Sequence, residues 1–424
     1  MLITSIAYGT RGDVQPALAL ARRLKADGHT VRMVVASNFT DMVERHGLTA
    51  VPADVDIKEL LKTAGGLDLI ESGKKVSFPR SVRTMRRLFT EHGPAMIDNA
   101  YRACVDADLI LSAFLSNVLA VSIREKLGVR HISTMVTPSA VATRSGAATL
   151  GAPRPGGESV ANYLLQKAVI ERVDWSLTRD PVDRFRRETL GLPPLTLGDY
   201  LRRLRSTPVL HGISPSVMPH PGDWPGTMHT TGYWFLPEDP DWEPKPELLD
   251  FLDAGEPPVF LTFGSMTGRD PRATTRLLLD AVVRSGRRAI LQSGWAGLGE
   301  ADLPKNVHLL DLAPYGQLLP RVGALVHHAG AGSTAEGLRA GLPTVAIPHM
   351  GDQPYWGTRI HQLGVGPRPI PRTKLTVENL ASAIREATDD PEMRRRATAL
   401  GAKIRSEDGL STASRLINDY VSAS

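Results

Sequence analysis

Cysteine, aromatic residues and net charge are all scarce in this sequence. Its 424 residues include one cysteine and 5% Phe, Trp and Tyr, while 50 Lys and Arg against 45 Asp and Glu leave a formal charge of +5. The single Cys104 excludes an intramolecular disulfide framework and a cysteine-rich metal site, and it favours a reducing compartment. Basic residues are scattered rather than gathered with aromatics, which argues against nucleic-acid binding. We therefore expect a cytoplasmic protein that binds no nucleic acid.

Long hydrophobic runs are missing as well. The first residues, MLITSIAYGTRGD, carry no basic leader, and we interpret them as a buried strand rather than a signal peptide. The most apolar long stretch, 109–123, contains several serines and an asparagine, and it falls short of the roughly 20 apolar residues that span a bilayer. The sequence thus predicts no stable membrane insertion.

What the sequence does contain is an alternation of short apolar runs and helical patterns. Expected strands cover residues 2–8, 30–36, 109–112, 129–135, 259–263, 289–292, 307–310, 324–327 and 344–347. The first helix is expected to begin at Pro16, because proline is favoured in the first turn of a helix. Continuous apolar strands separated by helices indicate parallel sheets covered on both faces. The predicted fold class is α/β, with two Rossmann-like, doubly wound domains facing a central cleft.

A proline-rich stretch divides the chain into two halves. Residues 208–258 are rich in Pro, Trp and Asp and show no long periodic pattern. Because proline restricts its own backbone and that of the residue before it, this stretch should be extended and stiff. The predicted organisation is an N-terminal domain over 1–233, a linker over 234–257, a C-terminal domain over 258–405, and a helix within 406–424 that packs back on the N-terminal domain.

The most informative segment is ALVHHAGAGSTAEGLRAGLP, at residues 324–343. A buried strand ends at two histidines, and a turn containing Gly330 and Gly332 leads into a helix expected to open near Ser333. A helix N-terminus presents free N–H groups and a partial positive charge, which suits an anion. The hydroxyl groups of Ser333 and Thr334 add donors. The segment therefore favours a diphosphate site, with His328 as a further donor.

The same glycines also match the loose dinucleotide-binding fingerprint, Gly330-x-Gly332-x-x-Ala335. Asp352 lies about 20 residues on, where that motif requires an acid for the ribose. However, the acid should end the second strand of a compact βαβ unit, whereas Asp352 follows the expected strand by several residues. A purely structural turn would explain the glycines but not the histidine pair, the Ser-Thr pair and the Asp-Gln pair together. A nucleotide-sugar site fits better than either alternative.

The longer run HHAGAGSTAEGLRAGLPTVAIPHMGDQPYWG resembles the nucleotide-sugar signature of the family 1 glycosyltransferases with the GT-B fold. The resemblance is strongest to the sterol and antibiotic (glycopeptide, macrolide) glycosyltransferases. It extends along the chain through GTRGDVQP, HTTGYWFLP, FLTFGSM and LQSGWAGL, in that order. The resemblance implies that residues 1–233 bind the acceptor and residues 258–405 bind the donor.

The resemblance also implies roles for individual residues of the donor half. His328, Ser333 and Thr334 would contact the diphosphate, together with the glycine turn, and Glu336 the ribose. Asp352 and Gln353 would contact the hydroxyl groups of the donor sugar. Ser265 would reach the phosphates, Trp295 would lie near the nucleotide, and the backbone around Ala313 would hold the base. The sequence departs from the family pattern at Ala329, in place of a frequent glycine that should be dispensable, and at Tyr315, which follows Pro314 where relatives often have histidine.

The motif GTRGDVQP, at residues 9–16, follows the first expected strand. A tight turn with Asp13 near a helix start would be a structural explanation. Sugar transfer, however, needs a base that accepts the proton of the acceptor hydroxyl group. The resemblance assigns that role to Asp13 and places Thr10, Arg11 and Gly12 in the acceptor loop.

The implied reaction is a single displacement with inversion, without a metal and without a cofactor beyond the nucleotide sugar. Three Asp-x-Asp triplets, Asp54/Asp56, Asp106/Asp108 and Asp239/Asp241, are interpreted as solvated turns, because none follows a clear strand. Arg80, Arg83, Arg86 and Arg87 form a basic amphipathic stretch, for which a solvated face is the simpler interpretation and a weak membrane contact is the alternative. By resemblance, segments around 55–90 and 139–160 line the acceptor site.

The predicted function is transfer of a hexose from a UDP- or dTDP-sugar to a hydroxyl group of a lipophilic small molecule, such as a sterol, a macrolide or another aglycone. The expected partners are these two substrates, and the protein is expected to be a monomer or a homodimer. Two alternatives stay open: an NAD(P)-dependent oxidoreductase, and a catalytically silent glycosyltransferase-like partner protein.

Overall fold

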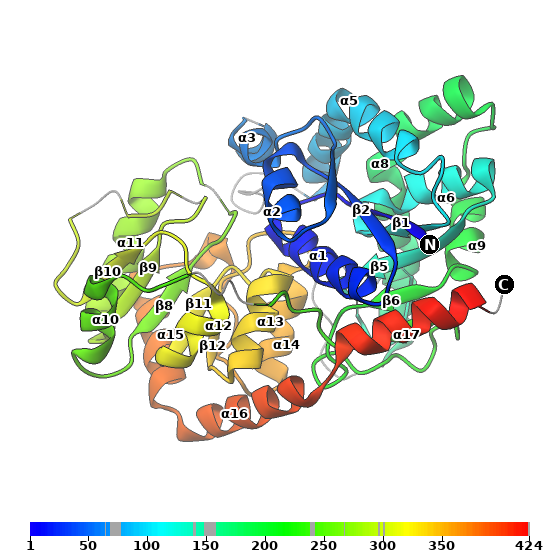
Figure 1. Cartoon of the computed structure of the whole chain (residues 1–424). Coiled ribbons are helices and arrows are strands. Elements are labelled where there is room, and N and C mark those ends of the chain that lie inside the picture. The colour runs from blue at the N-terminus through cyan, green and yellow to red at the C-terminus, as the bar shows by residue number, and fades with distance from the viewer. Residues whose placement is uncertain are drawn as a thin grey trace. The chain divides into compact units, whose positions relative to one another are not determined.

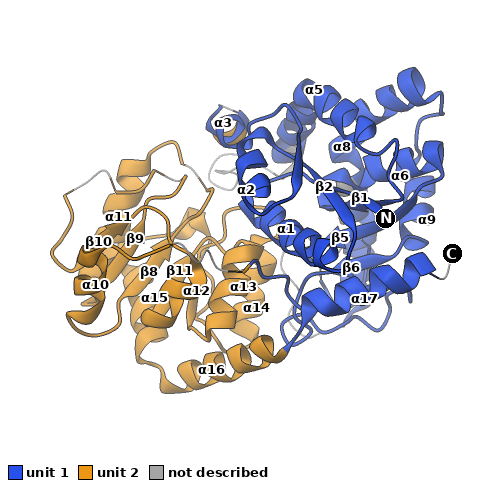
Figure 2. Cartoon of the chain, viewed as in Figure 1, with its two compact units in different colours: residues 1–65, 78–236, 407–424 blue, residues 66–77, 237–406 orange. Residues whose placement is uncertain are grey.

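The computed structural model describes residues 1–63, 65–67, 78–138, 141–147, 158–237, 242–266, 268–295, 297–299 and 302–422. Contacts divide the chain into two compact units, coloured separately in Figure 2. Unit 1 contains residues 1–65, 78–236 and 407–424, and unit 2 contains residues 66–77 and 237–406. Each unit is built around one parallel sheet.

The sheet of unit 1 has seven strands in the order β3-β2-β1-β4-β5-β6-β7 (Figure 1). The strands are β1 (Leu2–Ala7), β2 (Thr30–Val35), β3 (Thr49–Pro52), β4 (Leu109–Ser112), β5 (Arg130–Met135), β6 (Val209–His211) and β7 (Met228–Thr230). All neighbours run parallel, and β1 pairs with β2 and β4 through Leu2↔Thr30 and Ile3↔Leu109. From β1 the chain adds strands first on one side (β2, β3) and then, from β4 on, on the other side. Open α/β sheets bind ligands at the carboxyl ends of the strands next to such a switch point.

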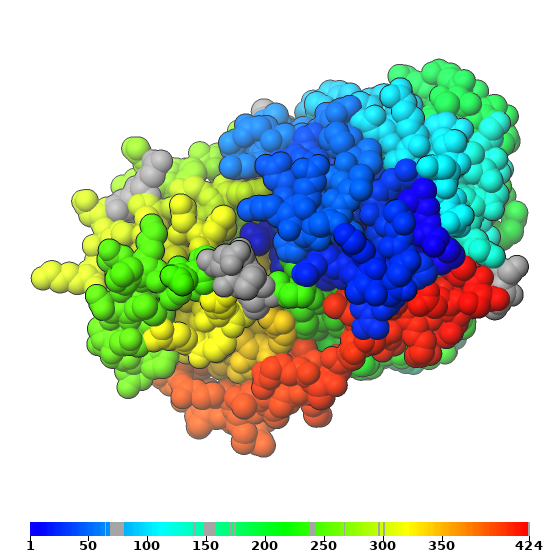
Figure 3. Space-filling view, in the orientation of Figure 1, coloured from blue at the N-terminus to red at the C-terminus, as the bar shows by residue number. Residues whose placement is uncertain are grey.

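Helices cover the faces of this sheet. They are α1 (Arg11–Ala26), α2 (Thr40–Arg45), α3 (Ile57–Lys62), α5 (Phe78–Arg102), α6 (Asn117–Leu127), α7 (Val160–Leu165), α8 (Glu171–Phe185) and α9 (Leu197–Arg205), with π-helical turns at Gln166–Ile170 and Arg186–Leu190. The C-terminal helix α17 (Gly409–Ser422) lies beside α1, and Figure 3 shows the two ends of the chain in contact. Arg23 donates to Ser411, and Ser414 donates to Asp27. The last helix therefore belongs to unit 1.

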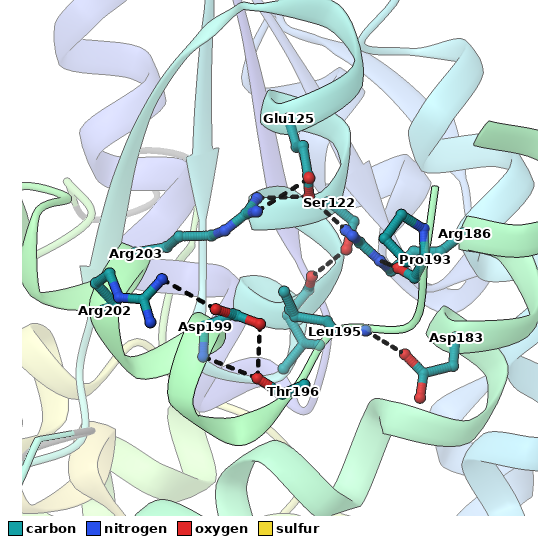
Figure 4. Close-up of polar contacts among 11 residues, drawn as sticks. Ser122, Glu125, Asp183, Arg186, Pro193, Leu195, Thr196, Asp199, Arg202 and Arg203 are labelled. Atoms are coloured by element: carbon teal, nitrogen blue, oxygen red, sulfur yellow. Dashed lines mark hydrogen bonds and ion pairs between the residues drawn. The ribbon is translucent and has the colours of Figure 1, made fainter. Parts of the chain in front are cut away.

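A partly buried ion-pair network joins α6, α9 and the second π-helical turn (Figure 4). Arg186 is 1% exposed, and it donates to Glu125 of α6 at 2.8 Å and to the carbonyl oxygen of Pro193 at 2.7 Å. Arg203 of α9 also donates to Glu125. A buried arginine without a partner would be strongly destabilising, so Glu125 is required by the packing of these elements.

The sheet of unit 2 has five parallel strands in the order β10-β9-β8-β11-β12. They are β8 (Val259–Thr262), β9 (Ala289–Gln292), β10 (Val307–Leu310), β11 (Ala324–His327) and β12 (Thr344–Ala346). The helices are α10 (Pro246–Asp253), α11 (Pro271–Ser285), α12 (Tyr315–Leu318), α13 (Ala331–Ala340), α14 (Gln353–Gln362), α15 (Val377–Asp389) and α16 (Pro391–Ser406). Successive strand residues such as Phe260 and Leu261 join separate apolar clusters on opposite faces, as burial of both faces requires.

The segment 234–257, expected to be an extended linker, contains helix α10. Its Leu248 and Leu252 are buried in the same cluster as Phe260 of β8. Pro246 stands at the start of this helix, where its missing N–H group has no cost. The expectation of a stiff, extended stretch was therefore wrong for these residues, because a proline at a helix start is compatible with the helix that follows.

Candidate functional site

Most of the predicted donor-binding residues follow strands of unit 2 at the carboxyl edge of its sheet. Ser265 follows β8, Trp295 follows β9, Ala313 follows β10, and His328 follows β11. Asp352 comes after β12, in the turn before α14. In a parallel sheet these strand ends share one edge, and the strand order reverses between β8 and β11. The fold thus brings the predicted residues to the edge where such sheets bind ligands.

The helix after β11 begins at Ala331, two residues earlier than the expected start near Ser333. Gly330 is its N-cap and offers no side-chain hydrogen bond. The first helical bond runs from the amide of Thr334 to the carbonyl oxygen of Gly330, at 2.9 Å. The amides of Ala331, Gly332 and Ser333 therefore have no acceptor within the helix. They form an N-terminus suited to an anion.

His328 lies against this N-terminus. Its side chain is 8% exposed, and its Nδ1 atom is buried without a hydrogen-bond partner. Burial lowers the pKa of the imidazole to about 4, so His328 is neutral at pH 7 and has one N–H group to donate. A Cβ atom on Gly330 would lie 2.3 Å from His328 Nε2. Gly330 is thus required by the histidine ring, in addition to any approach of a ligand to the backbone.

Ala329 adopts a left-handed conformation with φ +62°. Its amide donates to His327 Nδ1 at 3.1 Å, which helps to hold this conformation. Alanine in place of the frequent glycine therefore carries a conformational cost of about 1 kcal/mol or more that glycine would avoid.

The hydroxyl residues and the acid of α13 differ in accessibility. Ser333 is partly exposed, whereas Thr334 is 1% exposed and its Oγ1 atom is buried without a hydrogen-bond partner. Glu336 is held by an ion pair with Arg339 at 3.0 Å. Of the two hydroxyl groups predicted to meet a diphosphate, that of Ser333 is therefore the accessible one.

The turn before α14 is braced by Gln353. Its Oε1 atom accepts from the amides of His349 at 2.7 Å and Met350 at 3.1 Å, and the side chain is 5% exposed. Asp352 Oδ2 accepts from Trp356 Nε1 at 2.6 Å. Both predicted sugar-binding residues are therefore fixed by contacts of their own, with the oxygen of Gln353 committed to the backbone.

Two residues near this edge were not predicted as site residues. His349 stacks edge-to-face with His328, with ring centroids 6.5 Å apart, and burial lowers its pKa to about 3. Tyr315 packs on Phe260, and its hydroxyl group reaches Gln292 Oε1 at 3.3 Å. His349 stands within the matched run IPHMGDQ, which could have drawn attention to it. No sequence pattern indicates the contact that Tyr315 makes.

In unit 1, helix α1 begins at Arg11, and Pro16 lies inside it. The expected start at Pro16 was therefore wrong. Thr10 is the N-cap, and its amide donates to Asp13 Oδ2 at 2.8 Å. Asp13 thus belongs to the first helical turn, where a carboxylate satisfies a free amide and interacts favourably with the helix dipole.

Asp13 is partly exposed as a residue, and its carboxylate is closely surrounded. A Cβ atom on Gly9, which has φ +131°, would lie 2.3 Å from Asp13 Oδ2. Burial raises the pKa of Asp13 to about 6, against the lowering effect of hydrogen bonds from Thr10. A carboxylate with a pKa near the working pH is suited to general-base chemistry. Of the other predicted loop residues, Arg11 is exposed and donates to Gln15 at 3.1 Å, and Gly12 lies in the first helical turn.

Within the described residues, no group of three His, Cys, Asp or Glu side chains could hold a metal ion. Two of the Asp-x-Asp triplets have structural contacts: Asp54 accepts from Asn99, Asp56 caps α3, Asp106 pairs with Arg32, and Asp108 accepts from the amide of Leu2. The third, Asp239/Asp241, lies outside the described residues. In the basic stretch, Arg86 pairs with Asp180 at 2.6 Å. No helix among the described parts of the chain is long and apolar enough to cross a membrane.

Comparison with known proteins matches both halves to glycosyltransferase families. Residues 3–144 match the glycosyltransferase family 28 N-terminal domain, and residues 276–411 match the C-terminal domain described as erythromycin biosynthesis protein CIII-like. Sterol 3-beta-glucosyltransferase UGT80B1 of Arabidopsis thaliana is 35% identical over 97% of this chain, and a sterol 3-beta-glucosyltransferase of Aspergillus fumigatus is 34% identical over 98%. The chain belongs to the family 1 glycosyltransferases with the GT-B fold.

Solved structures support the fold of this family member. The glycosyltransferase of kitacinnamycin superposes with a TM-score of 0.70 at 21% identity, covering 99% of this chain and 98% of that one. SsfS6 of Streptomyces sp. SF2575, complexed with thymidine diphosphate, gives 0.65 at 20% identity, with 99% of each chain covered. This chain spans 66% of the Arabidopsis relative and 29% of the Aspergillus one. The comparisons lend no support to the oxidoreductase or to the silent-partner alternative.

Proposed function

We propose that this chain transfers a hexose from a UDP- or dTDP-sugar to a hydroxyl group of a lipophilic acceptor, with inversion at the anomeric carbon and without a metal. Unit 2 binds the donor and unit 1 binds the acceptor. The observation that carries the proposal is the open N-terminus of α13, with the imidazole of His328 packed against its N-cap, Gly330.

On the donor side, the free amides of Ala331, Gly332 and Ser333 bind the diphosphate. His328 donates a hydrogen bond to it, and this contact strengthens as the leaving group gains charge. Glu336 binds the ribose, and Asp352 and Gln353 contact the donor sugar. Ser265, Trp295 and the backbone near Ala313 complete the nucleotide site. These assignments follow the family resemblance and the shared edge of the sheet.

On the acceptor side, Asp13 is the general base. Its carboxylate takes the proton of the acceptor hydroxyl group while that oxygen forms a bond to the anomeric carbon of the sugar. The bond from the anomeric carbon to the diphosphate oxygen breaks in the same step, and the nucleoside diphosphate leaves with the electron pair. The raised pKa of Asp13, about 6, supports this role.

We infer a sterol as the first acceptor to test and UDP-glucose as the first donor, because relatives at 34–35% identity are named sterol 3-beta-glucosyltransferases. Macrolide and other aglycone acceptors with dTDP-sugars form the second set, since structures with this fold include a glycosyltransferase complexed with thymidine diphosphate and one named as the calicheamicin glycosyltransferase.

The test is mass spectrometry of reactions that combine UDP-glucose, UDP-galactose and dTDP-glucose with a 3β-hydroxysterol, a macrolide aglycone and an aromatic aglycone. A product heavier than its acceptor by one hexose supports transfer, and proton NMR of the anomeric centre reports inversion. Full activity in EDTA is the expected result for a reaction without a metal.

Calorimetry with UDP, dTDP and NAD tests the binding half separately. Binding of UDP or dTDP is expected, with none for NAD. A protein that binds nucleoside diphosphate but forms no product with any acceptor would agree with the silent-partner alternative and contradict catalysis.

A further inference from the structure

A short irregular segment of unit 1, residues 141–147, is held by side chains from two distant parts of the chain. The amide of Ala142 donates to Glu171 Oε1 at 3.2 Å, and the amide of Thr143 donates to Gln166 Oε1 at 2.9 Å. The amide of Arg144 donates to Asp223 Oδ2 at 2.8 Å. Three consecutive amides thus find three separate side-chain acceptors, where a strand or helix would have used backbone carbonyl groups.

Two of the three side-chain acceptors that hold this segment are buried, whereas the third, Asp223, is exposed. Gln166 is 4% exposed and Glu171 is 2% exposed, and the side chain of Thr143 is fully buried and donates to Asp223 Oδ1. On the other side, Asn162 donates its Nδ2 to the carbonyl oxygen of Arg144 at 3.2 Å. Buried polar contacts of this kind fix one conformation, because losing a partner leaves a desolvated polar group unsatisfied.

The helix that supplies Asn162 and Gln166 has its polar side chains inside and apolar ones outside. Val160 and Leu164 of α7 are each 57% exposed, whereas Asn162 and Gln166 are buried. Gln166 also begins a π-helical turn, and such turns occur often at functional sites. A helix arranged for its own stability would bury the leucine. The arrangement instead serves the contacts to residues 143 and 144.

Residues 141–147 follow a strand that ends at the same edge of the sheet as β1, the strand before Asp13. These residues follow β5, and Asp13 follows β1, so both come from carboxyl ends of parallel strands of one sheet. Arg144 is the exposed residue of the segment, while Val141, Ala142, Thr143 and Ala147 are buried. Its backbone N–H and C=O groups are both held, so the position from which its side chain projects is fixed.

We propose that Gln166, Glu171 and Asp223 are positioning residues for acceptor binding, and that Arg144, whose backbone they hold, contacts the acceptor. An arginine suits an acceptor with a carbonyl, hydroxyl or acidic oxygen away from the reacting hydroxyl group. This inference rests on the proposed function, because it concerns the acceptor of that same reaction.

The experiment measures kcat and KM for donor and acceptor separately, using UDP-glucose and, in detergent micelles, a 3β-hydroxysterol that carries a second oxygen away from the reacting hydroxyl group. Gln166→Leu removes the oxygen that accepts from Thr143, and Gln166→Glu restores an acceptor oxygen. Gln166→Leu should raise the acceptor KM about tenfold with the donor KM within about twofold, and Gln166→Glu should recover most of the loss.

Arg144→Ala tests the contact without touching the buried groups, because its side chain is exposed. It should raise the acceptor KM by about tenfold at an unchanged melting temperature. Arg184→Ala, at an exposed arginine of α8 in the same unit, is the matched control and should behave as the wild type.

The outcomes separate this inference from the proposed function. If the wild type forms no glucoside and binds no sterol in equilibrium dialysis, the sterol assignment fails. If the wild type is active and Arg144→Ala leaves the acceptor KM unchanged, the inference is overturned. It is equally overturned if Gln166→Leu lowers only the melting temperature, or raises both KM values alike, since a structural role would then suffice.

Discussion

Each unit has a glycine-containing turn that leads from a central strand into a helix, and the two turns differ at one decisive position. In unit 1, Thr10 is the N-cap and Asp13 is the third residue of α1; in unit 2, Gly330 is the N-cap and Ser333 is the third residue of α13. Gly12 and Gly332 occupy the same place between them. The turn of unit 1 follows β1 and the turn of unit 2 follows β11, and each of these strands lies next to the point where the strand order of its sheet reverses.

The chemical difference between the two turns is whether a side chain accepts a hydrogen bond from the backbone amides at the start of the helix. In unit 1 the carboxylate of Asp13 accepts from the amide of Thr10, so the positive end of the helix meets a negative charge from the chain itself. In unit 2 no side chain caps α13, and the third residue is a neutral serine. One turn therefore carries its own carboxylate, which is the proposed base, whereas the other has no side-chain cap on its amides and is the proposed diphosphate site.

The largest effect should come from removing the base. Asp13→Asn keeps an oxygen that can accept from the amide of Thr10, so the helix start should be preserved. It should lower kcat by roughly 10²–10⁴-fold, because the amide cannot take a proton. Affinity for UDP should be unchanged, since the proposed UDP site is at α13 in the other unit. Near-normal turnover would remove Asp13 from the base role.

A second substitution makes the turn of unit 2 resemble that of unit 1. Ser333→Asp places a carboxylate where Asp13 stands in α1, and it should accept from the backbone amides at the start of α13. A diphosphate would then meet both an occupied N-terminus and a like charge. We expect UDP affinity, measured by calorimetry, to fall about 100-fold.

The control for this change is Ser333→Ala, which removes the hydroxyl group without adding a charge and should weaken UDP by only a few fold. Equal losses in the two variants would mean that the helix N-terminus is not where the diphosphate binds. In that case the difference between the two turns would concern only local stability.

Removal of the histidine beside the open turn should have a smaller effect. His328→Ala eliminates one hydrogen bond to the diphosphate and should raise the Kd for UDP about tenfold. His361→Ala, at an exposed histidine of α14 in the same unit, is the matched control and should leave the Kd unchanged. An unaltered affinity in His328→Ala would contradict the phosphate role of this side chain.

Much of this contrast could be predicted from the sequence. Apolar runs predicted β4, β9, β10 and β11 with their observed bounds, because buried parallel strands are nearly continuous in hydrophobicity. The helix starts were harder. Glycine at positions 12 and 332 disfavours a helix by intrinsic propensity, and Pro16 suggested a later start. The observed starts depend on the cap at Thr10 and on packing of each helix against its sheet.

Other features depend on contacts between residues far apart in the sequence. The buried hydroxyl group of Thr334, the brace at Gln353 and the hold on residues 142–144 by Gln166 and Asp223 have no local pattern. The inverted polarity of α7 contradicts the usual amphipathic rule and could not have been inferred from periodicity. Such exceptions are expected where local preference gives way to function.

The pH dependence of turnover gives the smallest effect and tests the unit 1 turn without a mutation. A single group with a pKa of about 6 is about nine-tenths ionised at pH 7 and about one quarter ionised at pH 5.5. Because the base acts in its ionised form, kcat should fall about fourfold over this range. Asp13→Asn should lose this acid limb, while UDP affinity of the wild type stays nearly constant over the same range.

Stability should respond to pH in the opposite sense. Burial raises the pKa of Asp13 above the ordinary value of 3.8, so the folded state binds its proton more tightly than the unfolded chain does. Asp13 therefore favours folding at low pH, and this contribution is lost as pH rises through about 6. Asp13→Asn should accordingly unfold at a slightly higher temperature than the wild type at pH 7, and at a similar one at pH 4. A carboxylate retained at a cost in stability is expected of a base, whereas a lower melting temperature in the variant would indicate that Asp13 serves α1 as a cap alone.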